Sequence, residues 1–159
     1  MRDDGRIDRG LIGSSADGFV VDVEKGAIRR FAEAIGDTTD IYVDEAAARA
    51  LGYPGIVAPP TFPTTFRPPA KPAWLRDLDE GRILAGEQGF RYARPIFAGE
   101  QLHCALRLTD IEDKQGRNGP MQLFVQDMTV TSSSGEAVCV NRRVLIYRGR
   151  VADAQRGTP

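Results

Sequence analysis

The sequence has 159 residues, which is long enough for one domain with a buried core and short for two. It carries 21 basic and 22 acidic residues, for a formal net charge of -1, and this balance argues against nucleic acid or an anionic membrane as a partner. No apolar run approaches the ~20 residues of a membrane span, and the charged N-terminus lacks the apolar segment of a secretory signal. We therefore expect a single cytoplasmic domain.

Three segments are expected along the chain. Residues 1–17 mix charge, glycine and serine without periodicity, which predicts a flexible lead-in. Residues 18–149 carry the regular apolar patterns of one domain, and the polar residues 150–159 predict a flexible tail. No internal repeat or low-complexity linker divides the domain.

The first part of the domain is predicted to contain a strand and two capped helices. Residues 18–24 alternate as a strand, and apolar residues then recur at the spacing of one helical face. The residues on this face are Ile28, Phe31, Ala32 and Ile35. Gly36 is a natural left-handed cap that ends the helix. After a polar loop, Asp44 is the expected N-cap of a second helix, which Gly52 closes.

The second part of the domain is predicted to be a sheet. Prolines are frequent between residues 59 and 72, and they leave room for short helical turns only. Strands are then expected over residues 83–94, 101–111, 121–132 and 137–148. A strand, a helical insertion and a run of antiparallel strands predict an α+β fold in which a sheet curls around a helical segment.

The familiar catalytic and cofactor motifs are absent. The sequence has no Gly-rich phosphate loop, no HExxH pattern and no paired CxxC pattern, so we expect no metal and no cofactor. The one histidine, His103, is predicted on the outward face of a strand, which argues against a Ser-His-Asp or Cys-His constellation. Cys104 and Cys139 have apolar neighbours and are expected to be buried free thiols.

Two motifs, in this order, carry a family resemblance: FAEAIGDTTDIYVDEAAARALGYPGIVAPPTF and LAGEQGFRYARPIFAGEQL. Together they resemble the MaoC-like (R)-specific hydratase and dehydratase group, and within it the N-terminal-type, fatty-acid-synthase-like dehydratase domain, over about residues 18–147. The resemblance implies a hot-dog fold, in which a curved antiparallel β-sheet wraps around a central helix that is partly irregular in this chain. It also implies dimers, and a substrate carried as a coenzyme A or acyl-carrier-protein thioester.

The resemblance places the catalytic positions in the loop after Gly36. Catalytic relatives carry an aspartate there and a histidine five residues later, because one group takes a proton while the other positions and returns it. Asp37 matches the aspartate, whereas Tyr42 stands at the histidine position. An unperturbed tyrosine, with a pKa of about 10, is a poor base at neutral pH. Asp37 has a second interpretation, as a turn residue that accepts backbone hydrogen bonds.

A second departure from the family lies at the start of the central helix. The family has a glycine there, whose backbone N–H helps to bind the thioester oxygen. Pro60 takes this place and has no N–H, so a donor worth on the order of 3 kcal/mol is lost. One hypothesis is that the irregular segment leaves room for a long or bulky acyl chain. Side chains of Phe62, Phe66 and Trp74 filling that space would contradict it.

Two further residues are candidates for substrate binding. Gln88 either contacts the substrate or pairs across the sheet. Arg94 either binds a phosphate or phosphopantetheine group or ties a strand to a loop. Arg142 and Arg143, near the end of the last strand, are expected to be surface charges.

These departures predict an acyl-thioester-binding, catalytically degenerate subunit of an (R)-specific enoyl-thioester hydratase or 3-hydroxyacyl-thioester dehydratase. Its partner would be a catalytic MaoC-type hot-dog subunit or a second copy of the chain. One open alternative is a self-sufficient homodimeric hydratase that uses Asp37 with Tyr42, or Asp40 and Glu87. A second is a non-enzymatic acyl-CoA-binding protein. A third is a thioesterase, with only Asp37 and Asp40 available as carboxylates.

Overall fold

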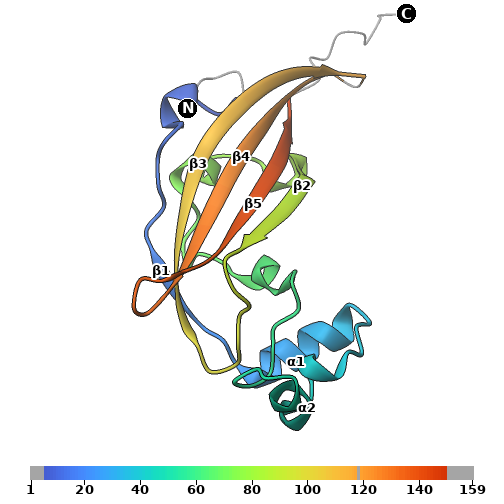
Figure 1. Ribbon diagram of the computed structural model, residues 1–159. Helices are drawn as coiled ribbons and strands as arrows, with labels where there is room; N and C mark the ends of the chain where they lie inside the picture. The colour runs from blue at the N-terminus through green and yellow to red at the C-terminus, as the bar shows by residue number, and fades with distance from the viewer. Residues whose placement is uncertain (1–5, 118, 150–159) are drawn as a thin grey trace, which may run out of the picture.

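The computed structural model describes residues 6–117 and 119–149. Within these residues, five strands form one antiparallel sheet in the order β1-β3-β4-β5-β2. The strands are β1 (Phe19–Asp22), β2 (Ile83–Tyr92), β3 (Gln101–Gly116), β4 (Gly119–Ser132) and β5 (Ala137–Arg148). The sheet is long and curved, and two helices, α1 (Lys25–Ala34) and α2 (Glu45–Ala50), lie together at one end (Figure 1). The four strands expected after residue 83 are confirmed, and β3 extends further than expected, to Gly116.

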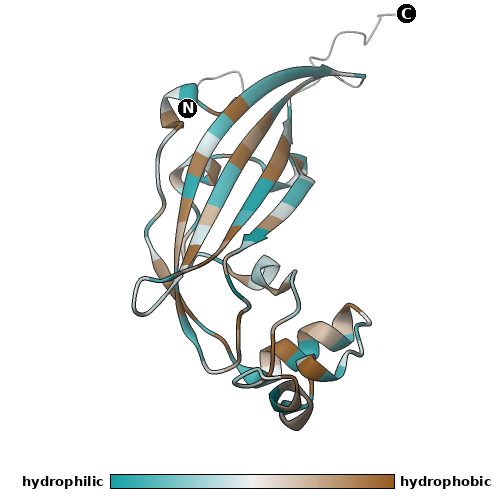
Figure 2. Ribbon diagram, in the orientation of Figure 1, coloured by the Kyte–Doolittle hydropathy of each residue, from teal (hydrophilic) through white to brown (hydrophobic). Residues whose placement is uncertain are grey.

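Side chains alternate along the strands between a covered face and an open face, which Figure 2 shows as alternating hydropathy. In β3, Leu102, Cys104 and Leu108 are buried, whereas His103 and Arg107 are exposed. The period-two pattern of the sequence therefore identifies the face of the sheet that carries the core.

Both helices have the caps expected from the sequence. The carboxylate of Asp44 accepts hydrogen bonds from the N–H groups of Ala46 and Ala47, at 2.7 and 3.4 Å. Gly36 and Gly52 follow α1 and α2 with left-handed φ angles of 71° and 87°. On the apolar face of α1, Ile28 and Ala32 are buried, Phe31 is half-buried and Ile35 is exposed.

The segment between α2 and β2 packs on the covered face of the sheet without forming an α-helix. It has 3-10 turns at Phe62–Thr65 and Ala73–Leu75, in agreement with its proline content. Phe62 and Phe66 belong to one apolar cluster of the core, and Trp74 belongs to a second one with Leu108 and Phe124. These short turns take the central position under the curved sheet.

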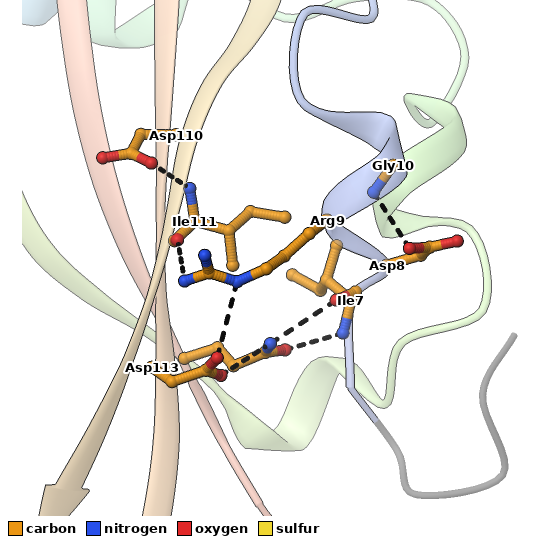
Figure 3. Close-up of polar contacts among 8 residues, drawn as sticks. Ile7, Asp8, Arg9, Gly10, Asp110, Ile111 and Asp113 are labelled. Carbon is orange, nitrogen blue, oxygen red and sulfur yellow. Dashed lines mark hydrogen bonds and ion pairs between the residues drawn. The ribbon is translucent and has the colours of Figure 1, made fainter.

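Residues 6–17 pack against the sheet, which differs from the flexible lead-in expected for residues 1–17. Ile7 is 5% exposed, and its N–H donates a hydrogen bond to the side chain of Gln122 at 2.6 Å. Arg9 forms an ion pair with Asp113 and donates to the carbonyl of Ile111 at 2.7 Å (Figure 3). The apolar residues of this segment do not recur at the spacing of a helix or a strand, and their partners lie far away in the sequence. The sequence pattern therefore does not predict that residues 6–17 pack on the sheet. The flexible ends expected at residues 1–5 and 150–159 lie outside the described residues.

Candidate functional site

An open groove of about 380 Å³ lies where the loop after α1 meets the end of β2. Its walls come from residues 41–42 and 92–96 and from four residues between them, Tyr53, Val57, Ala58 and Pro60. Three of the residues singled out in the sequence, Tyr42, Pro60 and Arg94, line it together. The volume is within the range of ~300–1,000 Å³ that is typical of small-molecule sites. Asp37 and Gln88 are not among the lining residues.

Asp37 closes a local turn. Its Oδ1 atom accepts hydrogen bonds from the backbone N–H of Thr39 at 3.1 Å and from the hydroxyl of Thr39 at 2.6 Å. These contacts agree with the second interpretation of Asp37, in which it is a turn residue that accepts hydrogen bonds from the backbone. A catalytic role for Asp37 stays a prediction.

Tyr42 is half-buried at the edge of the groove. Burial raises the pKa of its phenol, and electrostatic interaction with Asp37 and then with Tyr53 raises it further. The phenol is therefore protonated at neutral pH. It can donate a hydrogen bond to a ligand, but it cannot accept a proton as the histidine of catalytic relatives does.

The start of the Phe62–Thr65 turn offers few free backbone donors. Pro59 and Pro60 have no N–H, and the N–H of Phe62 donates to the carbonyl of Pro59 at 2.8 Å. The carbonyl of Pro60 accepts a hydrogen bond from the hydroxyl of Tyr92 at 2.7 Å, and burial raises the pKa of Tyr92 well above its usual range. This contact joins the central segment to the end of β2.

The guanidinium of Arg94 is held by two carboxylates. It lies 2.7 Å from Glu100 and 3.2 Å from Glu136, and it also donates to the carbonyl of Pro95 at 3.0 Å. The hydrogen bond to Glu100 raises the pKa of Arg94 most, and Glu136 raises it further, so the positive charge of Arg94 is paired within the chain. The contacts support the interpretation in which Arg94 ties a strand to a loop.

Gln88 pairs across the sheet. Its amide nitrogen donates to the side-chain oxygen of Asn141 at 3.0 Å. Tyr92 lies four positions after Gln88, which is a distance of roughly 13 Å along β2. Gln88 therefore lies away from the groove.

The hypothesis of an acyl channel under the central segment is wrong. Phe62, Phe66 and Trp74 are 3, 4 and 3% exposed, and their side chains fill the space that a packed helix would occupy. A cavity of only about 30 Å³ remains beside Phe66. The open groove is thus the larger of these two spaces.

Tyr53 and Tyr92 were not predicted as groove residues. For Tyr92, the only indication in the sequence was its place in the second family motif. Tyr53 follows the cap of α2 and is part of no periodic pattern, so nothing in the sequence indicated it. In the described residues, no group of three His, Cys, Asp or Glu side chains is placed to hold a metal ion. None of the helices in these ranges is long and apolar enough to cross a membrane.

Comparison with known sequences gives a consistent match over most of the chain. The family described as "FAS1-like, dehydratase domain region" matches residues 10–141. A UPF0336 protein of Saccharopolyspora erythraea is 35% identical over 138 residues, which cover 84% of this chain and 86% of that protein. A UPF0336 protein of Thermobifida fusca is 34% identical over 141 residues, covering 86% and 88% of the two chains.

Solved structures match as well. The ChsH1-ChsH2 complex of Mycobacterium tuberculosis contains a chain that is 27% identical, with a TM-score of 0.72 and coverage of 87% of this chain and 90% of that one. The C-terminally truncated HadBC (3R-hydroxyacyl-ACP dehydratase) complex of the same organism has a 27% identical chain with a TM-score of 0.72, covering 86% and 96%. The R-hydratase PhaJ1 of Pseudomonas aeruginosa, at 17% identity and a TM-score of 0.61 with 87% and 83% coverage, shares the fold.

The curved antiparallel sheet packed on a central segment is thus the α+β hot-dog fold of the MaoC-like hydratases and dehydratases. The expected fold class is confirmed. Within this class, the chain belongs to the FAS1-like dehydratase domain family.

Proposed function

We propose that this protein is the acyl-thioester-binding, catalytically degenerate subunit of an (R)-specific enoyl-thioester hydratase or 3-hydroxyacyl-thioester dehydratase, acting in cytoplasmic fatty-acyl metabolism. The observation that carries the proposal is the state of Tyr42. It stands at the position of the catalytic histidine and lines the groove, and its surroundings raise its pKa. A general base needs a pKa near the working pH, so the proton transfers must come from another subunit.

The groove supports a binding role. Val57 and Ile96 supply apolar wall, and the hydroxyls of Tyr42 and Tyr53 are available at its edge as hydrogen-bond donors. An acyl thioester combines an apolar chain with a carbonyl acceptor, which matches this lining. Because aromatic side chains fill the core beneath the central segment, the acyl chain would lie in the groove or against the partner.

Two observations support a partner subunit. The matched structures of ChsH1-ChsH2 and HadBC are complexes of two subunits. In this chain, β2 is an edge strand of 10 residues that is exposed along most of its length, whereas the other edge strand, β1, has only 4 residues. An exposed edge strand of this length is a template for pairing with a second sheet.

The test is coexpression with a catalytic MaoC-type hot-dog protein from the same genome, followed by copurification and hydration assays on crotonyl-CoA and its acyl-carrier-protein form. We expect a stable complex that hydrates one of the two thioesters, and no activity from this chain alone. Failure to form a complex contradicts the proposal. Activity of the lone chain that is lost in Asp37→Asn identifies the self-sufficient enzyme instead. Tight thioester binding with no conversion by any partner identifies the non-enzymatic binding protein.

A further inference from the structure

A row of polar side chains crosses the covered face of the sheet. Gln88 of β2 is the register partner of Arg143 in β5, and Arg143 is the register partner of Gln126 in β4. Register partners in antiparallel strands project from the same face of the sheet. Along β4, Gln126 lies between Phe124, which belongs to one apolar cluster of the core, and Met128, which belongs to the other. The row is therefore a polar interruption of the core.

Arg143 is the cation of this row, and its side chain is half-buried. It makes no ion pair and no side-chain hydrogen bond with any residue in the described ranges, 6–117 and 119–149. The adjacent Arg142 projects to the opposite face, where it pairs with Asp127 at 3.7 Å. Burial and then the positive charge of Arg67 lower the pKa of Arg143. The expectation that Arg142 and Arg143 are both surface charges is thus wrong for Arg143.

A small cavity opens beside this guanidinium. Its volume is about 30 Å³, and its lining includes Arg143, Gln126, Phe66 and Pro68. Phe66 and Pro68 flank Arg67 in the chain, so the segment that covers the cavity also carries the second cation. One water needs roughly 10–15 Å³ by the same measure. The cavity therefore has room for a group with two oxygen atoms.

The amide of Gln126 is available to a ligand. Gln126 is 3% exposed, and its side chain makes no hydrogen bond within the part of the chain that the structure describes. The neighbouring amide of Asn141 is paired at both its oxygen and its nitrogen, since it accepts from Gln88 at 3.0 Å and donates to the carbonyl of Pro63 at 3.3 Å. Among the described residues, the fully enclosed side-chain atoms without a partner are the Nε1 of Trp74 and the Oδ1 of Asp127. The amide of Gln126 is not one of them, so it is open to the cavity, where a ligand can reach it.

We propose that Arg143, Gln126 and Arg67 form a binding site for the carboxylate of a small organic acid. The planar guanidinium of Arg143 matches the two oxygens of a carboxylate, the amide of Gln126 supplies another donor, and Arg67 adds positive charge. The cavity admits only the carboxylate group, so a short alkyl chain would extend through its open side along the apolar wall of Phe66 and Pro68, whereas a hydrated phosphate is too large to enter. Because residues 66–68 of the same chain cover the cavity, a small acid fits better than another polypeptide.

This site is separate from the groove at Tyr42, so the inference does not rest on the proposed function. The test uses the full chain and titrates it with sodium butyrate, with sodium chloride and sodium phosphate at equal ionic strength as comparators. Thermal unfolding is measured for the unaltered protein, for Arg143→Gln and for Arg142→Gln. Arg142→Gln is the matched control, because it removes the same charge from the opposite face.

We expect a saturable rise of roughly 3–5 °C in the unfolding midpoint when butyrate reaches about ten times its Kd. The rise persists in Arg142→Gln and disappears in Arg143→Gln. An equal response to chloride, or an equal response of both variants, overturns the proposal. A carboxylate supplied by another protein chain would leave butyrate without effect, and that result also overturns it.

A second measurement does not depend on the variants folding. In the ¹⁵N spectrum of the unaltered protein, the Nε–Hε signal of Arg143 moves saturably with butyrate while that of Arg142 stays in place. Signals of both arginines that do not move, or that move together in proportion to salt, contradict a carboxylate site.

Discussion

At Tyr42, the surroundings stabilise the protonated phenol. Burial, and then electrostatic interaction with Asp37 and Tyr53, raise its pKa, so the folded state holds this proton more tightly than the unfolded chain, whose tyrosine pKa is about 10. The contribution to stability is complete below pH 10 and is lost as the pH rises through the folded-state pKa.

Tyr42→Phe cannot ionise, so its unfolding free energy should fall less between pH 9 and 11 than that of the unaltered protein. Urea unfolding at several pH values in this range checks the prediction. The two proteins should differ by a constant amount below pH 9. Parallel curves up to pH 11 would show that the environment does not raise the pKa of Tyr42.

At Asp37, two substitutions distinguish the effect of the hydrogen-bond acceptor from the effect of the negative charge. Asp37→Asn keeps an oxygen that accepts from Thr39, so its stability should match the unaltered protein, while Asp37→Ala should lose about 1 kcal/mol of unfolding free energy. Urea unfolding measures both. If the chain is catalytically degenerate, the complex with the catalytic partner keeps its hydratase activity in Asp37→Asn, and a large loss there would place Asp37 in the chemistry.

At the scale of elements, Glu45 joins the two helices. Its carboxylate accepts from Lys25, which begins α1, and from Arg49 of α2 at 2.9 Å. The hydrogen bond from Lys25 is the larger of the two effects, and together they lower the pKa of Glu45 to about 2. A lowered pKa stabilises the fold above the unfolded value of about 4.3, and the contribution is lost as the pH falls from there toward 2.

Glu45→Gln should therefore lower the thermal midpoint near pH 7 and leave it unchanged near pH 2. The difference should shrink at high salt, because the ion pairs lie at the surface. Calorimetry at pH 7, 4 and 2 gives the comparison. Glu80→Gln is a suitable control, since Glu80 forms an exposed pair with Lys71 away from the two helices. If the thermal midpoints of Glu45→Gln and the unaltered protein differ by the same amount at every pH, the ion pairs of Glu45 with Lys25 and Arg49 do not stabilise the fold.

The N-terminal segment behaves as an element of the domain. Ile7→Ala should cost about 2 kcal/mol of unfolding free energy, because its side chain is buried against the second apolar cluster. Ile12→Ala is the matched control, since Ile12 is 39% exposed, and it should change the stability by less than about 0.5 kcal/mol. Chemical unfolding of both variants tests whether the domain begins before residue 18. If the two substitutions lower the unfolding free energy equally, Ile7 is not packed in the core.

At the scale of the whole molecule, the two edges of the sheet differ. The edge at β2 is long and exposed, while the edge at β1 is short. If the catalytic subunit pairs with this sheet, its strand should align with β2.

Hydrogen exchange of the chain alone and in the complex distinguishes the edges. Peptides that cover residues 83–92 should gain protection in the complex, because unpaired amides of β2 find partners. Peptides that cover residues 19–22 should exchange at the same rate in both states. Protection confined to residues 19–22 would assign the interface to the other edge.

Local features of the sequence determined most of the elements. The caps at Asp44, Gly36 and Gly52 and the irregular segment after Pro59 depend on residue chemistry within a few positions, so they were predictable. The assignment of Tyr42 to the catalytic histidine position depends on the alignment of one motif and stays a prediction.

The tertiary structure alone decided what fills the covered face. Phe62, Phe66 and Trp74 close the space that irregular backbone seemed to leave open, and Arg143 turns toward the core while its neighbour Arg142 faces away. Burial depends on contacts between residues that are far apart in the sequence, and periodicity within one strand does not say which neighbours will cover it. For this reason the sequence identified the loop at Tyr42, but only the packed sheet showed the half-buried guanidinium of Arg143 beside the cavity that Phe66 and Pro68 line.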